Sequence, residues 1–415
     1  MSFNILEELT LQDVAIKITD GTHSTVKNNI NGKCYLLSAK NIKNGQIVIQ
    51  ESDRKIDLDT MSKLNKRTNM DTGDVLITTV GTLGESALIK DRNLNYEFQR
   101  SVAIIKPDTS KILPEFLYYM TLSNDFKSQV EGYSSGSVQK CLFLGAINSI
   151  KIKIPAIAVQ KKISEMLTSL DEKIEVNNQI NKNLEKMAKA IYKSWFIDFE
   201  PFQEGEFLDS EIGMIPKGWK VGPVENFFEI SIGKTPPRKE SIWFSKDRKD
   251  VKWVSITDMG KSGLYIFDTN ERLTSEAISK HNIKIIPAET VLLSFKLTIG
   301  RISITSDDVT TNEAIAHFKN DKNNINEYLY YFLKNFNFDS LGNTSSIATA
   351  VNSKVIKRMK ILVPEDKVLN DFHYIVSKIM IKIKNNEIEN QKLESIRDTL
   401  LPKLMSGEIR IPIEE

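Results

Sequence analysis

Three short segments carry residue types that serve catalysis or cofactor binding in other proteins. Gly233-Lys234-Thr235 has the glycine, lysine and hydroxyl of a phosphate-binding loop, but the first glycine of that loop would fall at Phe228. Gly81-Thr-Leu-Gly84 lacks the third glycine and the following long helix of a dinucleotide-binding turn. Asp171-Glu172-Lys173 has the residue types of a nuclease cluster, and a charged helix surface facing solvent explains it better. None of the three predicts catalysis.

Cysteine and histidine usage argues against metal and disulfide chemistry. The two cysteines, Cys34 and Cys141, are too few for a disulfide framework or a four-thiolate zinc site. The four histidines have no ligand spacing between them. An Asn-Pro-Pro-aromatic segment, the signature of base-flipping amino-methyltransferases, is also missing from the sequence. We therefore expect no catalytic residue, no metal and no cofactor in this chain.

The composition indicates a globular protein of more than one domain. The chain has 415 residues, of which 27% are charged and 40% hydrophobic, whereas one domain usually takes about 100–200 residues. The 56 basic and 54 acidic side chains leave a net charge of +2. Binding to nucleic acid therefore depends on local patches. Because there is no signal-like N-terminus and no long apolar run, we expect a cytoplasmic protein that does not enter a membrane.

The sequence contains an internal duplication. GSVQKCLFLGAINSIKIKIP at 136–155 matches SSIATAVNSKVIKRMKILVP at 345–364, an offset of 364 − 155 = 209 residues. Further matches in the same order join 115–120 to 327–332 and 74–78 to 290–294, with offsets that drift to 216. Loop insertions between preserved elements would produce this drift. Each half has short alternating strands followed by about 40 strongly helical residues.

Both helical segments show the 4-3-4-3 apolar spacing of a coiled coil. The first seam comprises Ile163, Leu167, Leu170, Ile174, Asn177, Asn181, Leu184, Ala188, Ile191 and Trp195. The second seam comprises Phe372, Val376, Ile379, Ile383, Asn386, Asn390, Leu393, Arg397, Leu400 and Leu404.

Two asparagines lie at the centre of each seam, at equivalent positions of the repeat (386 − 177 = 209). One interpretation is that each helix packs on its own domain only. The interpretation we favour is that the helices pair antiparallel, so that each buried amide finds an amide partner. A buried asparagine costs stability but fixes register, because a slipped alignment leaves it unsatisfied.

Three segments resemble the DNA-specificity subunit of type I restriction–modification enzymes. They are SWFIDFEPF at 194–202, EGEFLDSEIGMIPKGW at 204–219 and LLPKLMSGEIRI at 400–411. The Gly-Thr-His of 21–23 and the Gly81–Gly84 turn also fit, and the resemblance covers essentially the whole chain. The second half departs from it mildly, with Lys234-Thr-Pro-Pro-Arg238 where the first half has Gly21-Thr-His-Ser-Thr25.

The resemblance implies an α+β fold with two similar α/β target-recognition domains, joined by two long antiparallel helices that form a coiled-coil spacer with an internal pseudo-twofold repeat. It implies a non-catalytic subunit that reads a bipartite, asymmetric double-stranded DNA target with a fixed gap. It also implies two methyltransferase subunits and motor–endonuclease subunits as partners. S-adenosylmethionine, ATP and Mg²⁺ are expected in those partners and not in this chain.

The predicted boundaries follow from the repeat, the helical segments and the turn-rich residues between the halves. They are 1–155 for the first target-recognition domain, 156–199 for the central helix, 200–217 for a linker, 218–364 for the second target-recognition domain, 365–405 for the distal helix and 406–415 for a C-terminal tail.

The candidate DNA contacts are basic or hydroxyl-bearing residues in predicted turns, since phosphates attract Lys and Arg while base edges are read by Arg, Ser or Thr. In the first domain they are Thr22, His23, Ser24, Lys27, Lys63, Lys66, Arg67, Thr82, Arg100 and Lys140. In the second domain they are Lys234, Thr235, Arg238, Lys239, Lys246, Arg248, Lys296, Thr298 and Arg301.

Several alternatives remain open from the sequence. The aromatic runs 116–119 and 328–331 either stack on bases or pack in the core, and core packing explains them better. Trp195 and Phe196 either anchor a partner or lie in the core. A stand-alone two-headed DNA-binding regulator without enzyme partners is the alternative function, and an undetected enzyme is a third.

Overall fold

The computed structural model describes residues 6–91, 94–134, 140–320, 322, 324–341 and 351–411. The chain divides into two compact units. Unit 1 consists of residues 1–174 and 392–415, and unit 2 consists of residues 175–391. The division falls inside both long helices, so each unit receives part of each helix.

Unit 1 is built on a four-stranded antiparallel sheet with strand order β2-β10-β7-β8. The strands are β2 (Ala15–Asp20), β10 (Val102–Pro107), β7 (Val75–Thr78) and β8 (Ser86–Leu88). Val75 and Ile77 face a core that includes Phe116 of helix α3 (Pro114–Thr121), whereas Leu76 faces a second cluster that includes Phe98. The period of two residues in a strand therefore places apolar side chains on both faces of the sheet.

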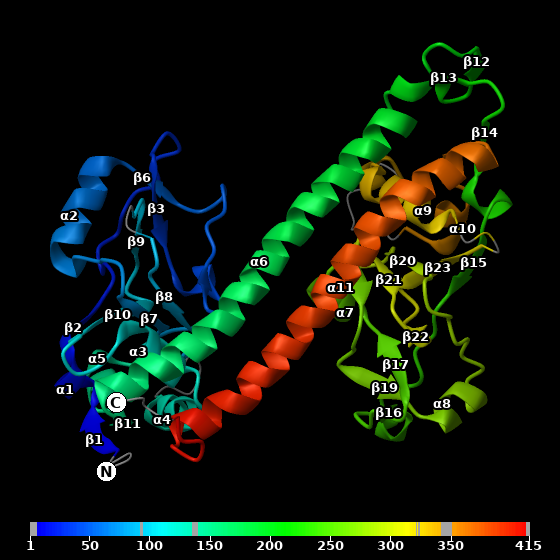
Figure 1. Cartoon of the computed structure of the whole chain (residues 1–415). Coiled ribbons are helices and arrows are strands. Elements are labelled where there is room, and N and C mark those ends of the chain that lie inside the picture. Colours follow the sequence, from blue (N-terminus) through cyan, green and yellow to red (C-terminus); the bar gives the residue numbers. More distant parts are fainter. Residues whose placement is uncertain are drawn as a thin grey trace. The chain divides into compact units, whose positions relative to one another are not determined.

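The remaining elements of unit 1 surround this sheet (Figure 1). A three-stranded sheet has the order β6 (Lys55–Ile56), β3 (Cys34–Leu37), β9 (Tyr96–Phe98), and β4 (Ile42–Lys43) pairs with β5 (Gln46–Ile47). Strand β1 (Glu7–Thr10) pairs with β11 (Lys151–Ile154). The other helices are α1 (Leu11–Val14), α2 (Leu58–Thr68), α4 (Asn124–Tyr133), α5 (Leu144–Asn148) and the 3₁₀ turn η1 (Ala39–Asn41).

Unit 2 repeats this plan with a larger sheet. Its five strands have the order β15 (Glu229–Ile232), β23 (Ile315–Lys319), β20 (Val291–Ser294), β21 (Ile302–Thr305), β18 (Tyr265–Ile266). A second sheet has the order β16 (Phe244–Ser245), β19 (Glu271–Leu273), β17 (Val251–Val254), β22 (Val309–Thr311), and β14 (Lys220–Pro223) pairs with β24 (Lys360–Val363). The helices are α7 (Ile256–Lys261), α8 (Ser275–Lys280), α9 (Asn326–Asn335) and α10 (Ser353–Lys357), with 3₁₀ turns η3 (Val224–Asn226), η4 (Ser241–Trp243) and η5 (Phe338–Leu341).

The predicted duplication is confirmed element by element. The matched segments form β7 and β20, α3 and α9, and β11 and β24, at the same places in the two units. The described parts of 136–155 and 345–364 form a short helix followed by a strand in both copies, α5 with β11 and α10 with β24.

The two helical segments form continuous helices of 40 residues each, α6 (Ile157–Phe196) and α11 (Asp366–Met405). In unit 2, Asn177 donates from Nδ2 to Oδ1 of Asn390 at 2.9 Å, and Asn386 donates from Nδ2 to Oδ1 of Asn181 at 2.7 Å. Because the residue numbers rise along one helix as they fall along the other, the helices are antiparallel. In unit 1, Ile163 and Leu167 of α6 share a core with Leu401 and Leu404 of α11.

The predicted seam positions are all buried or half-buried, and the four asparagines are all buried. Further bonds surround the amides: Asn177 Nδ2 also donates to Glu389 Oε2 at 2.8 Å, and Asn390 Nδ2 donates to Asn178 Oδ1 at 2.8 Å. The hydrogen-bond network of the amides therefore includes Glu389 and Asn178, which are not seam positions.

One sequence interpretation on α6 needs correction. Asp171 does not face solvent, because its carboxylate accepts hydrogen bonds from Arg397 Nη1 at 2.8 Å and from the Tyr119 hydroxyl at 2.8 Å. Asp171 follows the seam residue Leu170 and therefore lies beside α11. A carboxylate that is partly removed from water there needs a hydrogen-bonding partner. Its ion pair with Arg397 explains why an arginine occupies a seam position.

The segment predicted as a linker is structured. It contains the 3₁₀ turn η2 (Glu200–Phe202) and a hairpin of β12 (Phe207–Ser210) with β13 (Gly213–Pro216). Gly213 at the hairpin turn has φ of +103°, which favours glycine. Its many Gly and Pro residues indicated turns but did not reveal the strands between them.

Candidate nucleic-acid interface

Strands β2 and β7 end, and β8 and β10 begin, at one end of the unit 1 sheet. We call the segments that meet there, residues 21–23, 79–85 and 99–101, the loop end of unit 1. They are joined by backbone hydrogen bonds from Thr22 N to Phe98 O at 2.8 Å and from Thr79 N to Ser101 O at 2.9 Å. Leu142 N donates to Thr79 O at 3.0 Å, which brings Lys140 to the same place.

The loop end of unit 2 has the same construction, from residues 233–235, 295–301 and 312–314. Lys234 N donates to Thr311 O at 3.0 Å, and Phe295 N donates to Ala314 O at 2.9 Å. These bonds are the equivalents of the two in unit 1. The duplication therefore preserved the backbone frame at this end of the sheet.

A glycine begins the first segment of each loop end because two backbones approach closely there. A Cβ atom on Gly21 would overlap the carbonyl oxygen of Phe98, and one on Gly233 would overlap the carbonyl oxygen of Asn312. Any side chain would push the segments apart. This explains the glycine of both Gly21-Thr-His and Gly233-Lys-Thr without phosphate or dinucleotide chemistry.

In unit 1, the structure brings five of the predicted DNA contacts to the loop end: Thr22, His23, Thr82, Arg100 and Lys140. Arg100 and Lys140 are exposed. Ser24 and Lys27 follow the Gly21 turn and are exposed, whereas Lys63 and Lys66 project from α2.

Arg67 has a structural role that the sequence did not indicate. Its guanidinium pairs with the buried carboxylate of Asp20, and Nη1 donates to the carbonyl oxygen of Gly21 at 3.0 Å. His23 Nε2 lies 2.6 Å from the other oxygen of Asp20. Arg67 thus ties the C-terminus of α2 to the turn that carries Thr22 and His23, and no sequence spacing signals this pair.

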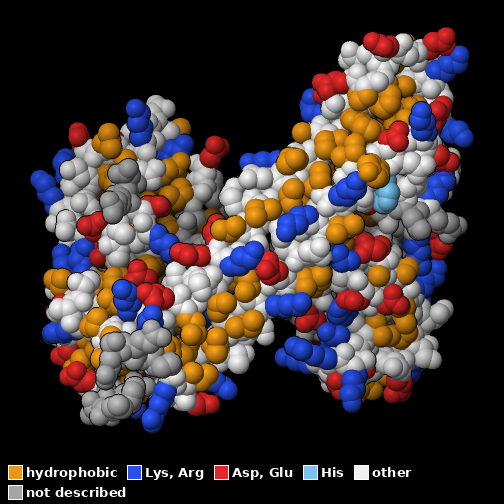
Figure 2. Space-filling view, viewed as in Figure 1, with side chains coloured by type: hydrophobic (Ala, Val, Ile, Leu, Met, Phe, Trp, Pro, Cys, Tyr) orange, Lys and Arg blue, Asp and Glu red, His pale blue; other side chains and the backbone are white. Residues whose placement is uncertain are grey.

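In unit 2, five predicted contacts lie at the loop end: Lys234, Thr235, Lys296, Thr298 and Arg301. Arg301 donates to the carbonyl oxygen of Ile256 and so also supports α7. Lys239, Lys246 and Arg248 are exposed around η4 and β16. Figure 2 shows Lys and Arg side chains gathered over this end of unit 2.

Arg238 is exposed but makes several contacts within its own domain. Its guanidinium binds Glu271 through Nη1 at 2.8 and 3.0 Å and lies 4.1 Å from the centroid of the Phe244 ring and 4.4 Å from that of Trp253. Cation–π contacts and an ion pair together hold it in place. These contacts fix the orientation of the guanidinium, and Arg238 stays a predicted DNA contact.

An acidic residue that was not predicted as a DNA contact lies at the loop end of unit 2. Glu313 is exposed, accepts a hydrogen bond from the Thr235 hydroxyl, and occupies the place that Arg100 holds in unit 1. The predicted contacts were limited to basic and hydroxyl side chains, so an acidic residue was not among them. The repeat offset near this position would have paired it with Arg100.

A buried histidine, His317, forms hydrogen bonds with the strands next to the loop end of unit 2. His317 contacts the hydroxyls of Thr311 at 2.6 Å and Ser231 at 3.0 Å, and burial lowers its pKa to about 3. It is therefore a neutral hydrogen-bonding group next to Thr311 and not a charged DNA contact.

The aromatic runs lie in the core. Phe116, Leu117 and Tyr119 are buried in unit 1, as are Tyr328–Tyr331 in unit 2, so stacking on bases is excluded for them in this fold. Phe196 is also buried, whereas Trp195 is half-buried against Phe372 and Phe202.

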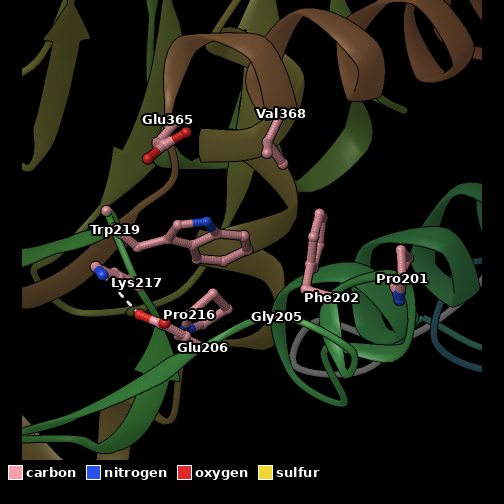
Figure 3. A pocket seen from close by; sticks show the side chains of 10 residues that line it. Pro201, Phe202, Gly205, Glu206, Pro216, Lys217, Trp219, Glu365 and Val368 are labelled. Atoms are coloured by element: carbon pink, nitrogen blue, oxygen red, sulfur yellow. Dashed lines mark hydrogen bonds and ion pairs between the residues drawn. The ribbon is translucent and has the colours of Figure 1, made fainter.

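The hairpin beside α11 borders a hollow of about 730 Å³ in unit 2. Figure 3 shows Trp219 facing Phe202, with Val368 above it and the Lys217–Glu206 ion pair at one side. Lys217 and Glu206 are satisfied by each other at 2.6 Å. Glu365 is the one further charged side chain of this lining, which is fewer than the several convergent polar groups that orient a small ligand.

The described residues also bear on metal binding and membrane insertion. They contain no cluster of three or more His, Cys, Asp or Glu side chains able to hold a metal. Among the same residues, every helix is too short or too polar to cross a membrane.

Comparison with known proteins decides the family. A model of the type I restriction modification DNA specificity domain matches residues 6–186 and again residues 216–398. The chain belongs to this family. The two matches follow the duplication, so each half of the chain carries one specificity domain, and the resemblance seen in the sequence is confirmed.

Two relatives illustrate the similarity. The chain is 28% identical to the specificity subunit of the HindI type I restriction enzyme of Haemophilus influenzae, over 81% of this chain and 86% of the relative. It is 27% identical to the MjaIX specificity subunit of Methanocaldococcus jannaschii, over 97% of this chain and 93% of the relative. A solved specificity subunit from M. genitalium shares the fold, with a TM-score of 0.58, 15% identity and coverage of 100% and 98%.

Proposed function

We propose that the loop ends of the two specificity domains each recognise one half of a split double-stranded DNA target, and that the two halves differ in sequence. The family supplies the class of function, DNA specificity in a type I restriction–modification system. The loop ends supply the residues. In this proposal the chain itself performs no catalysis and works in the cytoplasm.

One observation carries the proposal: the loop ends share a backbone frame but carry different side chains. Thr22 is replaced by Lys234 at the equivalent position, and Arg100 is replaced by Glu313. Arginine reads the acceptor pair on guanine, whereas a carboxylate accepts from the amino group of cytosine. Two heads of this kind favour an asymmetric target, which a symmetric dimer of identical heads would not read.

The exposed lysines and arginine beside the loop ends are suited to the DNA backbone. Lys63 and Lys66 on α2 in unit 1, and Lys239, Lys246 and Arg248 in unit 2, are exposed. Phosphate contacts fix position without reading bases. We therefore assign base reading to the loop ends and phosphate binding to these side chains.

We assign the gap between the half-sites to α6 and α11, because both helices belong to both units. The buried asparagine pairs support a constant gap, since a slipped register would leave amides unsatisfied. A fixed register between the helices is what a fixed number of base pairs requires.

We further propose that two copies of a methyltransferase subunit bind the outer faces of these helices. Exposed apolar residues recur there at equivalent positions of the repeat: Met166 and Ile396 in unit 1, and Ile375 and Met187 in unit 2. Figure 2 shows hydrophobic side chains among charged ones on the helix surfaces. Two similar apolar patches suit two copies of one partner.

The chemistry then belongs to the partners. In this proposal S-adenosylmethionine lies in the methyltransferase subunits, and ATP and Mg²⁺ act in motor–endonuclease subunits that join the same assembly. The part assigned to this chain is to bind DNA and to hold those subunits at the target.

The test is methylome sequencing of cells that express the chain with its neighbouring methyltransferase gene, before and after residues 1–155 are replaced by the matching residues of the Haemophilus influenzae relative. We expect a bipartite methylated motif in which the exchange alters one half and leaves the other half and the gap unchanged. A motif altered in both halves would contradict independent heads. DNA binding without any methylation or co-purifying methyltransferase would favour the stand-alone regulator.

A further inference from the structure

The loop between β20 and β21 carries a leucine in an unfavourable state. Leu297 has φ of +61°, in the left-handed region that glycine and asparagine occupy far more readily than leucine. Its side chain is 99% exposed. Neither the backbone nor the side chain of Leu297 therefore stabilises the fold. A residue in such a state is a candidate for function.

The turn around Leu297 is well held, so the leucine is presented in a defined position. Gly300 N donates to Ser294 O at 3.0 Å, the Ser294 hydroxyl donates to Thr298 O at 2.6 Å, and Arg301 N donates to the Ser294 hydroxyl oxygen at 3.0 Å. These bonds close the turn on both sides of Leu297.

The first domain shows that the turn does not require a leucine. Its equivalent position is Gly81, with φ of +83°, and the same bonds recur from Gly84 N to Thr78 O at 3.0 Å and from Glu85 N to the Thr78 hydroxyl at 3.0 Å. Glycine adopts this conformation without strain. Leu297 is thus a side chain that unit 2 carries at a place where the shared frame needs none.

The surroundings of Leu297 match a DNA surface. Lys296 and Thr298 flank it, and the bond from Phe295 N to Ala314 O places the turn in the loop end of unit 2, with Lys234 and Glu313. A lysine attracts phosphate, while an apolar side chain gains nothing from phosphate or water. Apolar side chains contact DNA at the thymine methyl group or by unstacking a base step.

We infer that Leu297 is an apolar base contact of the second specificity domain, for which the first domain has no counterpart. The inference rests on the proposed function, because it assumes that the loop end of unit 2 faces DNA. It adds an apolar specificity-determining residue to the polar side chains that read base edges.

The test uses the full chain in complex with its methyltransferase subunit and duplexes that carry the motif found by methylome sequencing. Leu297→Asn removes the apolar side chain and introduces a residue that adopts the left-handed conformation readily. Leu297→Met keeps an apolar side chain. The matched control is Ile285→Ala, which also removes an exposed apolar side chain. Ile285 lies away from the loop end of unit 2, because its neighbour Lys284 pairs with Glu229, at the opposite end of β15 from the Gly233 turn.

We expect Leu297→Asn to weaken DNA binding roughly tenfold, which is the effect of losing one base contact. Leu297→Met and Ile285→Ala should bind within about twofold of the parent, which is a smaller change than the loss of one base contact. The loss should be confined to duplexes with an intact second half-site. Uracil in place of thymine reproduces the loss if Leu297 contacts the methyl group. If Leu297 instead unstacks a base step, 2-aminopurine placed in the duplex at that step should become more fluorescent when the parent binds, but not when Leu297→Asn binds.

Two results would overturn the inference, and they differ from each other. If a bipartite motif is methylated and Leu297→Asn binds it as tightly as the parent, Leu297 is not a base contact and the proposed function stands. If no bipartite motif is found, the proposed function fails and the inference fails with it.

Discussion

Arg100 and Glu313 occupy the same place in the two copies of the fold. Each lies two residues after a carbonyl group that accepts a hydrogen bond from the backbone N–H of the residue after Gly21 or Gly233. The carbonyl belongs to Phe98 in unit 1 and to Thr311 in unit 2. Opposite charges on one backbone frame are difficult to explain by folding, since both side chains are exposed. They are readily explained by two heads that read different bases.

We predict that Arg100→Ala weakens binding of the full complex by about 1–3 kcal/mol, the value of one base contact. Its backbone bonds do not depend on the side chain, so thermal stability should be unchanged. Binding titrations with duplexes altered in one half-site at a time would measure this, with the exposed Lys153→Ala on β11 as control. Equal losses for both variants would show that only general charge matters.

The basic residues of α2 should separate into two roles. Lys63→Ala with Lys66→Ala removes two exposed charges, so the log–log salt slope of binding should fall by about 2 for any DNA sequence. Arg67→Ala should instead lower the melting temperature, because the buried charge of Asp20 would lose its arginine partner and keep only the contact with His23. A slope unchanged in the double variant would place α2 away from the phosphates.

The asparagine pairs should show strong coupling. Asn390→Leu alone leaves Asn177 without its amide acceptor and should cost about 1–3 kcal/mol. The double variant Asn177→Leu with Asn390→Leu should recover most of that loss, because a leucine pair suits a coiled-coil seam. Urea unfolding of the four species of this cycle measures the coupling, and additive effects would argue against a direct pair.

The repeat offers a natural control for the ion pair of Asp171 with Arg397. Their equivalents in the second copy are Met380 and Ala188, both buried in the unit 2 core. We expect Arg397→Ala alone to destabilise by about 3 kcal/mol, because it leaves the Asp171 charge half-buried, and Asp171→Met with Arg397→Ala to be near neutral or stabilising. Thermal melts would decide, and a double variant less stable than the single one would contradict this account.

Glu387 should make stability depend on pH. Burial raises the pKa of this carboxyl to about 7, and the charge of Glu185 adds to the rise, although Leu264 N and Tyr265 N donate to it. The folded state thus holds a proton that the unfolded state has lost above about pH 4.5. Stability should therefore fall as pH rises from about 4.5 to 7, by at most about 3 kcal/mol.

Glu387→Gln cannot ionise, so it should flatten the pH dependence in this window while still accepting a hydrogen bond. Melting temperatures of parent and variant between pH 4.5 and 8 provide the measurement. Parallel curves would show that Glu387 does not titrate in this range.

The sequence determined the architecture because its signals are periodic and repeated. The 4-3-4-3 spacing predicted α6 and α11 to within three residues at each end, and the duplication predicted the order of β7, α3 and β11 and of their partners. Apolar periodicity reports which face of an element is buried, and this property survives without knowledge of the tertiary contacts. The Ser194–Trp219 segment was enough to indicate the family.

Only the tertiary structure decided which candidate side chains are also bound within their own domain. Arg67, Arg238 and Lys63 look alike in sequence and all three are exposed, yet the first pairs with Asp20 and the second is held by Glu271 and two aromatic rings. Likewise Arg397 in the seam is explained by Asp171, 226 residues away. Polar contacts between distant segments leave no period in the sequence, because each depends on a single pair of side chains brought together by the fold.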